Sequence, residues 1–326
     1  MFRFALLVFA MIFARIGYAQ FDTSYVHVTR NQFSIYPMAE TAYLQTNFSA
    51  LIPNELPFKS NLKSRTTTSL GFGMSFYRFG FSLSFQLPVT DIPELKKYTA
   101  FSFAGGYSYR RFYGELRYRN YRGFEENIVD TSNTQSEYNL RKDIKLRQIG
   151  VALYYFTARK YNFDAAFKNY NVQRKSAASF LVIAGGSRFD MSGKYLITDT
   201  NHITSDISFV REMDVYSFKL VPGGAFTLVY RNFYLSAMLG VGVNHNTLHI
   251  YGDNNKRKKN NFAPVIETRG VIGYNSTNWF ASLSLNIEDD FFYYTDVEFS
   301  VVNVFFNLKA GYKFDSKYLG KLGKYL

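Results

Sequence analysis

Residues 69–87, SLGFGMSFYRFGFSLSFQL, alternate apolar residues with small or polar ones on both sides of a turn at residues 77–80. The apolar set on the first arm is Leu70, Phe72, Met74 and Phe76, and on the second arm it is Phe79, Phe81, Leu83, Phe85 and Leu87. Successive side chains of a strand point to opposite faces. The stretch therefore predicts a β-hairpin with one apolar face and one face of Gly, Ser and Gln.

The same alternation returns along almost the whole chain, and no helical period of apolar residues supplies a layer that could cover these sheets. Lipid is then the expected cover. No run of 18 apolar residues follows residue 20, which argues against helical membrane spans. We therefore expect an all-β fold, a closed antiparallel transmembrane β-barrel.

Alternation gives thirteen candidate strands: 31–49, 57–77, 79–88, 97–109, 111–122, 143–158, 160–170, 176–189, 216–231, 232–250, 262–275, 277–289 and 295–314. A closed bacterial barrel normally has an even number of strands. We expect twelve, with one weak segment between residues 160 and 189 not being a strand. The alternative is fourteen, with 33–37 and 41–49 as separate strands.

The N-terminus has the pattern of a secretory signal peptide. Arg3 precedes an apolar run over residues 4–13, and the small residues Gly17 and Ala19 precede Gln20. This predicts a signal peptide over 1–19 and a single outer-membrane domain over 20–326, with a short C-terminal tail from residue 315. An uncleaved membrane helix is the alternative, but its apolar core is shorter than the ~20 residues that a span needs.

Composition agrees with a bacterial envelope protein. The chain has no cysteine and therefore no disulfide framework. Aromatic residues make up 19% of it, as expected for a barrel with aromatic girdles at both membrane interfaces. A Tyr-rich secreted adhesin or β-sandwich is the alternative for such a composition.

The connections between candidate strands alternate in length, which predicts the orientation. Short turns at 77–80, 109–112, 231–232 and 275–278 are expected in the periplasm, and longer polar connections at 125–142, 191–214 and 252–261 at the cell surface. Between residues 161 and 190 this alternation loses its phase.

Charged residues share one strand face with other polar residues, and that face is expected to line the lumen because a charge facing lipid at mid-depth costs roughly 2–4 kcal/mol. The predicted lumen-lining residues are Glu115, Arg117, Arg119, Asp164, Lys168 and Glu288. They form either a charged pore constriction or ligand site, or a self-neutralising network that fills a narrow lumen.

Other chemistry is sparse. His245 and His249 are too far apart on a strand, ~13 Å, to share a metal, and no nucleophile motif accompanies them. They are weak catalytic candidates only, and we expect neither an enzyme, a metal nor a cofactor. The run Lys256, Arg257, Lys258 and Lys259 is expected in a basic surface loop near lipopolysaccharide rather than on nucleic acid.

Three functions remain open at this point. The first is a narrow pore or structural envelope protein; the second is a lipid hydrolase or acyltransferase at the barrel rim, using His245 or His249; the third is a surface binding module acting through the long loops. Expected partners are outer-membrane lipid, lipopolysaccharide and the outer-membrane assembly machinery, which would bind the aromatic-rich last strand. The sequence leaves the oligomeric state and the solute open.

Four segments carry a family resemblance: FKSNLKSRTTTSLGFGMSFYRFGFSLSF, FYGELRYRNYRGF, KNYNVQRKSAASFLVIAGGS and NFYLSAMLGVGV. Together they resemble a family of exported proteins from the Bacteroidota, domain of unknown function 4421, over most of residues 30–314. The resemblance implies an outer-membrane β-barrel of a Gram-negative bacterium. It implies no catalytic residue or ligand.

Overall fold

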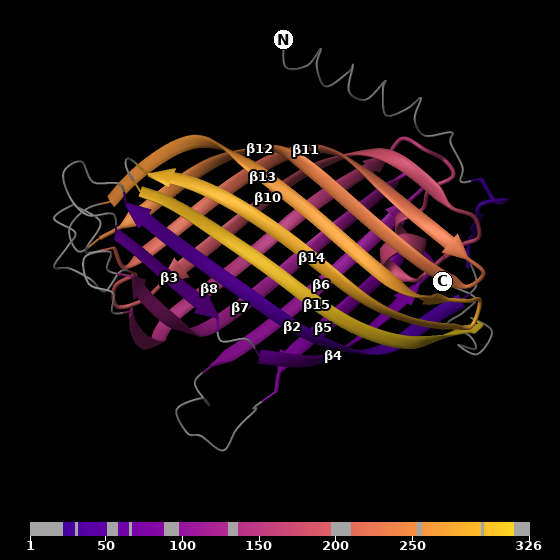
Figure 1. The fold of residues 1–326 in the computed structure, drawn as a ribbon, viewed down its shortest axis with the longest axis horizontal. Coiled ribbons are helices and arrows are strands. Elements are labelled where there is room, and N and C mark those ends of the chain that lie inside the picture. Colours follow the sequence, from indigo (N-terminus) through magenta and orange to yellow (C-terminus); the bar gives the residue numbers. More distant parts are fainter. Residues whose placement is uncertain are drawn as a thin grey trace, which may run out of the picture.

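The computed structural model is an antiparallel β-barrel (Figure 1). It describes residues 22–29, 32–50, 58–64, 67–87, 98–129, 136–196, 210–252, 256–294 and 297–315. The strands of the barrel wall are β2 (Gln32–Ala50), β3 (Phe58–Ser64), β4 (Thr67–Phe76), β5 (Phe79–Gln86), β6 (Thr99–Tyr109), β7 (Phe112–Val129), β8 (Ser136–Phe156), β10 (Ala177–Ser192), β11 (Glu212–Tyr230), β12 (Phe233–Tyr251), β13 (Lys256–Asn275), β14 (Trp279–Tyr294) and β15 (Val297–Asp315).

The wall is a twelve-stranded ring. β3 and β4 pair in succession with the two ends of β2, so they act as one interrupted strand. β15 pairs with β2 along nearly its whole length, which joins the two ends of the sheet. The prediction of a transmembrane barrel with twelve strands is confirmed. The alternative of fourteen is wrong because β2 is continuous.

Tight turns close one end of the barrel and longer connections lie at the other. The turns after β4, β6, β11 and β13 fall at the predicted positions. Tyr77, Arg110 and Arg231 adopt positive φ angles of 55°, 55° and 57° there, the left-handed conformation that two-residue hairpin turns need. We call the part of the wall next to these turns the turn half, and the opposite part the loop half.

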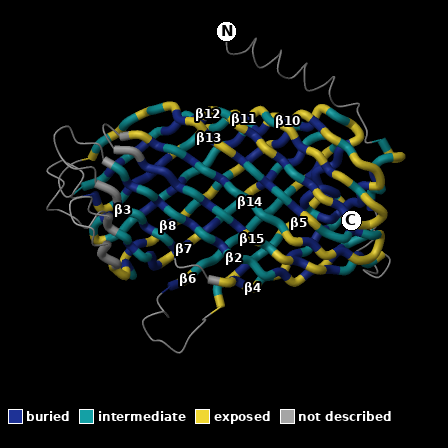
Figure 2. Tube along the Cα trace, in the orientation of Figure 1, coloured by how far each residue is buried: buried dark blue, intermediate teal, exposed yellow. Residues whose placement is uncertain are grey.

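The long strands that run through both halves, such as β8 and β12, change their apolar face where the halves meet. On β12, Leu235, Leu239 and Val241 face outward, whereas Leu248 and Ile250 near the other end face inward and are buried. The exposed and buried positions alternate along the strands (Figure 2). The outward apolar stretch of β12, residues 233–243, matches the ~9–11 residues that a tilted strand needs to cross a bilayer.

The interior of the loop half is a hydrophobic core. Its members come from nearly all strands around it: Ala42, Leu44, Phe48, Leu62, Tyr121, Phe124, Ile144, Leu146, Phe189, Met191, Leu196, Val210, Met213, Val215, Leu248, Ile250, Phe292, Phe299, Val301 and Phe305. The outward side chains at the same height are mostly polar, such as Lys145 and Arg147 on β8. This half therefore has the apolar interior and polar exterior of a water-soluble barrel.

The ring narrows between the two halves. The β5–β6 hairpin lies between β4 and β7 in the turn half only. Beyond its end, β3 pairs directly with β7. An irregularity in the β7–β8 ladder between Arg122 and Phe124 marks the step, and Gly123 there has a φ of 85° and lies against the Tyr98 ring. The described wall thus has twelve strands in the turn half and ten in the loop half.

Residues 157–176, between β8 and β10, fold into the barrel at the turn end, and we call them the plug (Figure 1). They contain the short π-helix η2 (Asp164–Lys168) and β9 (Val172–Gln173), which pairs with β1 (Val26–His27). The candidate strand over 160–170 is therefore absent, and the expectation that one weak segment between 160 and 189 is not a strand is confirmed. An inward excursion of this length also explains why the alternation of long and short connections loses its phase there.

Two predicted loops are shorter than expected. β7 continues to Val129 and β8 begins at Ser136, so most of 125–142 is strand. β13 begins at Lys256, so the basic run 256–259 is the loop-side end of a strand and the prediction of a basic loop is wrong. The predicted signal peptide and the tail beyond residue 315 lie outside the described residues. Among the described residues, no helix is long and apolar enough to cross a membrane.

Candidate functional site

The lumen of the turn half is the candidate site, and aromatic rings hold the plug against one side of it. Phe163 stacks on Tyr113 with ring centroids 4.2 Å apart and on Tyr154 at 5.3 Å. Tyr161 packs against Phe156 at 5.1 Å. All five rings are buried. The plug therefore closes this side of the lumen with the packing of a protein core.

Polar side chains of the wall fix the backbone of the plug. Asn169, at the left-handed end of η2, donates to the Tyr234 hydroxyl at 2.6 Å and accepts from the Ser282 hydroxyl at 3.0 Å. Asn275 donates to the carbonyl of Asn171 at 2.8 Å. Lys309 donates to the carbonyls of Phe167 and Lys168 at 3.2 and 3.1 Å. Because these groups are buried, releasing the plug would leave several of them without partners.

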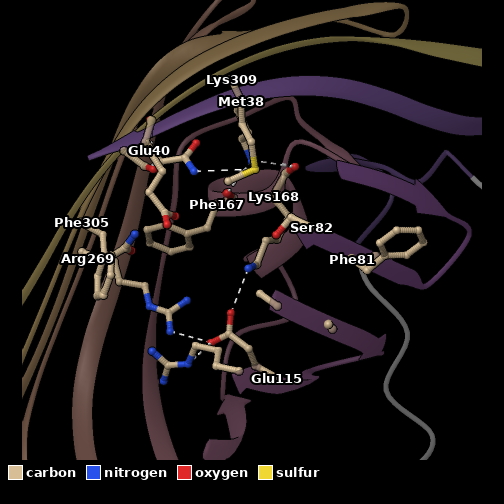
Figure 3. Close-up of a pocket in the computed structure, with 18 of the residues that line it drawn as sticks. Met38, Glu40, Phe81, Ser82, Glu115, Phe167, Lys168, Arg269, Phe305 and Lys309 are labelled. Atoms are coloured by element: carbon tan, nitrogen blue, oxygen red, sulfur yellow. Dashed lines mark hydrogen bonds and ion pairs between the residues drawn. The ribbon is translucent and has the colours of Figure 1, made fainter. Parts of the chain in front are cut away.

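A network of charges centred on Glu115 joins the plug to the wall (Figure 3). One carboxylate oxygen accepts from the Lys168 ammonium at 2.9 Å, and the other accepts from Arg269 at 2.8 Å. The Arg117 Nε lies 3.4 Å from the second oxygen. The carboxylate is almost fully buried, so these cations are what makes its burial tolerable.

A second carboxylate, Glu288 on β14, continues the network across the lumen. It pairs with Arg117 and lies 3.4 Å from the Arg119 guanidinium, whose centre stands 3.9 Å over the Phe305 ring. Phe305 belongs to the hydrophobic core of the loop half. The charged layer therefore lies directly between the plug and that core.

The network surrounds a cavity of about 130 Å³. Its lining includes the charged residues described above together with Glu40, whose carboxylate accepts from the hydroxyls of Ser84 and Ser102 at 3.2 Å each. The wall on that side is made of small residues, such as Gly80, Ser82 and Ala104. A space of this size and polarity holds several waters or one small polar solute.

Glycines in the small-residue wall make room for tyrosines. A Cβ at Gly106 would lie 2.2 Å from the Tyr113 hydroxyl, and one at Gly80 would lie 2.0 Å from the Tyr170 hydroxyl. Any side chain there would displace a ring that lines the cavity. Glycines of this face thus leave room for Tyr170 of the plug and for Tyr113 of β7.

The structure brings most of the predicted lumen residues together. Glu115, Arg117, Arg119, Lys168 and Glu288 all line the one cavity. Asp164 does not line it, and lies buried in η2. The acids among them are paired with the cations, so the arrangement is a network of ion pairs rather than an open ring of like charge.

Sequence reasoning missed Arg269 and Lys309, which complete the site. Arg269 lies on the inward face of β13 together with Glu267 and Val271, at every second position. This alternation is the sequence signal that could have identified Arg269 as a lumen residue. Lys309 shares a face of β15 with Asn303 and Lys313, which indicates an inward position but not a role. Its role as an anchor of the plug could be predicted only by recognising that residues 157–176 fold into the lumen.

The two histidine candidates lie on the outward face of β12 and not in the lumen. The His245 ring packs 4.8 Å from Phe262, and the His249 ring 5.8 Å from Tyr216. In the β11–β12 ladder, His249 stands directly opposite Asp214. The two histidines are therefore separate sites, at the height where the outward apolar residues end.

The sequence matches the family model described as Domain of unknown function (DUF4421) over residues 20–314. The chain belongs to the DUF4421 family. No curated protein matches this DUF4421 chain.

Solved structures similar to this DUF4421 protein are outer-membrane barrels. The outer membrane protease OmpT from Escherichia coli is 8% identical with a TM-score of 0.44, covering 90% of this chain and 100% of that one. The translocator domain of the autotransporter NalP from Neisseria meningitidis is 9% identical with a TM-score of 0.38, covering 85% and 88%. OmpT from Vibrio cholerae, an outer membrane protein, is 9% identical with a TM-score of 0.30, covering 86% and 97%. These likenesses concern the fold alone.

Proposed function

We propose that this DUF4421 protein is a non-conducting barrel of the bacterial outer membrane that holds its loop half beyond the outer leaflet as a surface module. The observation that carries the proposal is that the lumen is filled at two successive levels, by the plug in the turn half and by the hydrophobic core in the loop half. An origin in the Bacteroidota belongs to the same proposal and is supported by the sequence resemblance.

The filling favours a structural role over a pore. A pore needs a continuous aqueous path, whereas the described part of the lumen holds small cavities between the plug and the core, of about 130 Å³ and about 20 Å³. Moving the plug alone would not open a path, because the core of the loop half closes the other end. The function therefore resides in what the barrel presents to the outside rather than in what passes through it.

Conductance in planar bilayers tests the first part. The purified protein is expected to give no discrete current steps under conditions in which a general porin conducts. A variant whose residues 161–172 are replaced by a Gly-Ser linker is expected to remain closed as well. Stepwise currents from the wild-type protein would overturn the proposal.

Surface display tests the second part. An epitope tag inserted at residues 253–255, between β12 and β13, is expected to react with antibody on intact cells. A tag inserted in the turn after β11, at Arg231 and Asn232, is the matched control and is expected to react only after permeabilisation. The opposite labelling pattern would contradict the orientation and with it the display role.

A lipid-modifying enzyme is the second candidate, and the cross-strand pair of His249 and Asp214 favours it. A carboxylate opposite an imidazole on the lipid boundary can orient the imidazole as a general base for attack on an ester. The candidate predicts a change in the cell's lipid profile on expression, lost in His249→Ala and kept in His245→Ala. Identical lipid mass spectra with and without expression would exclude it.

A further inference from the structure

The turn end of the barrel is strongly basic. Its described connections carry eight cationic side chains that are all at least partly exposed: Arg78, Arg110, Arg111, Arg159, Lys160, Arg174, Lys175 and Arg231. Among the described residues, the acids of this end of the barrel are Asp22, Asp315 and the buried Asp164. We call these eight cations the turn rim. Its charge is not balanced by the neighbouring side chains.

Tyrosine rings hold most of the turn rim in place. The Arg78 guanidinium stands 4.8 Å from the ring centres of both Tyr77 and Tyr109, and Arg110 stands 4.9 Å from Tyr109. The same arrangement recurs for Arg111 over Tyr155, Arg231 over Tyr230, and Lys160 and Lys175 over Tyr25, at 4.9–5.6 Å. Cations over aromatic faces are attracted by the ring quadrupole, so these heads are directed along the rim rather than spread into solvent.

The height of these tyrosines sets the height of the cations. Tyr77, Tyr109 and Tyr230 are exposed residues at the ends of strands whose outward faces are apolar, such as Leu228 and Phe226 on β11. Tyrosines at such positions lie at the depth of lipid headgroups. Cations stacked on them therefore lie at the depth of the lipid phosphates.

At the other boundary of the outward apolar residues, two outward arginines are paired with acids. Arg147 pairs with Asp190 at 3.1 Å, and Arg188 pairs with Asp214 at 3.0 Å. Both pairs lie on the outward face, where the outward apolar residues end. The turn rim differs from this boundary in that its cations outnumber the acids beside them. Other exposed cations, such as Lys256 and Lys258, lie further toward the loop-side ends of the strands.

We propose that the turn rim binds the phosphate groups of anionic phospholipids in the leaflet that it faces, the periplasmic leaflet in the orientation given above. Guanidinium groups suit this ligand because they donate two parallel hydrogen bonds to phosphate oxygens. Charge complementarity and depth both match a lipid headgroup. The binding is electrostatic and therefore depends on salt.

Native mass spectrometry of the full-length protein tests the proposal, with phosphatidylglycerol and phosphatidylcholine supplied in equal amounts in mixed micelles. The wild-type protein is expected to retain phosphatidylglycerol at least about fivefold over phosphatidylcholine, the effect of one uncompensated cation near an anionic headgroup. Raising the salt to about 0.5 M should remove the preference, because the Debye length then falls to roughly 4 Å. The salt series needs no variant.

A pair of variants locates the binding. The rim variant carries Arg78→Gln, Arg110→Gln, Lys175→Gln and Arg231→Gln. Its control removes the same charge from exposed positions of the loop half, through Arg122→Gln, Lys145→Gln, Lys256→Gln and Lys258→Gln. Retention of the folded electrophoretic form on unheated gels confirms that both variants fold.

The preference for phosphatidylglycerol should disappear in the rim variant and persist in the control. Equal retention of the two lipids by the wild-type protein would overturn the proposal, as expected if the rim instead receives an acidic periplasmic protein. Loss of the preference in the control to the same extent as in the rim variant would overturn it too, because net charge and not the rim would then be responsible.

Discussion

The two halves of this barrel are built from the same strands with opposite polarity. In the turn half the outer face is apolar and the lumen holds charges, hydroxyls and a plug. In the loop half the outer face is mostly polar and the lumen holds a hydrophobic core. The comparison teaches that the surroundings of each half, lipid for one and water for the other, determine which face of a strand is apolar.

The two halves also differ in the number of strands around the lumen, and this difference matches what fills each lumen. Barrel diameter grows with the number of strands. Ten strands surround the loop half, where side chains of the wall and of the β10–β11 connection meet across the axis. Twelve strands surround the turn half, where the plug and its charge network are needed to occupy the wider lumen.

The largest predicted effect comes from truncating the core of the loop half. Phe124 is fully buried there, so Phe124→Ala should lower the free energy of unfolding by about 3–5 kcal/mol through lost burial and an unfilled cavity. Phe180→Ala is the matched control, because Phe180 is 78% exposed on the outer face and its removal leaves no cavity. Urea unfolding in lipid vesicles measures both. Equal losses would break the distinction between the halves.

A charge placed on the outer face should cost stability in one half only. Val241→Arg puts a cation on the lipid-facing part of β12 and should cost about 2–4 kcal/mol. His249→Arg puts the same side chain on the same face of the same strand in the loop half, where the effect should stay within about 0.5 kcal/mol. The difference between the two unfolding free energies in vesicles is the measurement. If both substitutions were tolerated, lipid would not cover residue 241.

The smallest effect concerns acid and the docking of β1 beneath the plug. Desolvation, followed by Arg174 and Lys313, lowers the pKa of His27 below its usual 6.5. The unfolded chain then binds more protons than the folded one near that pH, so stability should fall as the pH decreases through about 6.5 and be unaffected by His27 at higher pH.

The measurement is the difference in thermal midpoint between wild type and His27→Gln at pH 5.5 and 7.5. The wild type should lose more than the variant on acidification. A variant with the same acid sensitivity would remove His27 from the explanation. If the loss of stability on acidification disappears in His27→Gln, the acid response of the barrel lies in the turn half.

The turn half was largely predictable from the sequence, because its strands follow the simple alternation of residues 69–87. The loop half was not, although its signal is present. On β8, Ile149, Val151 and Leu153 occupy odd positions and face outward, whereas Ile144 and Leu146 occupy even positions and face inward. The prediction kept one apolar face along the whole length of each strand. It therefore missed that the apolar residues change from odd to even positions, and with this change it missed the hydrophobic core.

The plug was missed for a different physical reason. Asn162, Asp164 and Lys168 have the spacing of one strand face, but they belong to a buried turn and π-helix whose partners are tertiary. Local pattern cannot reveal that Asn169 bonds to Tyr234 and Ser282, over a hundred residues away in the latter case. The charge network was predictable in composition but not in its centre on Glu115.

The short β5–β6 hairpin has the topology of a modular insertion. In the loop half, beyond the end of the hairpin, β3 and β7 are already hydrogen-bonded neighbours. In the turn half, β4 and β7 run antiparallel to each other, so the ladder between β3 and β7 could continue between β4 and β7 if the hairpin were absent. The circumference of such a barrel can therefore change by two strands during evolution, or by design, while every register in the loop half stays as it is.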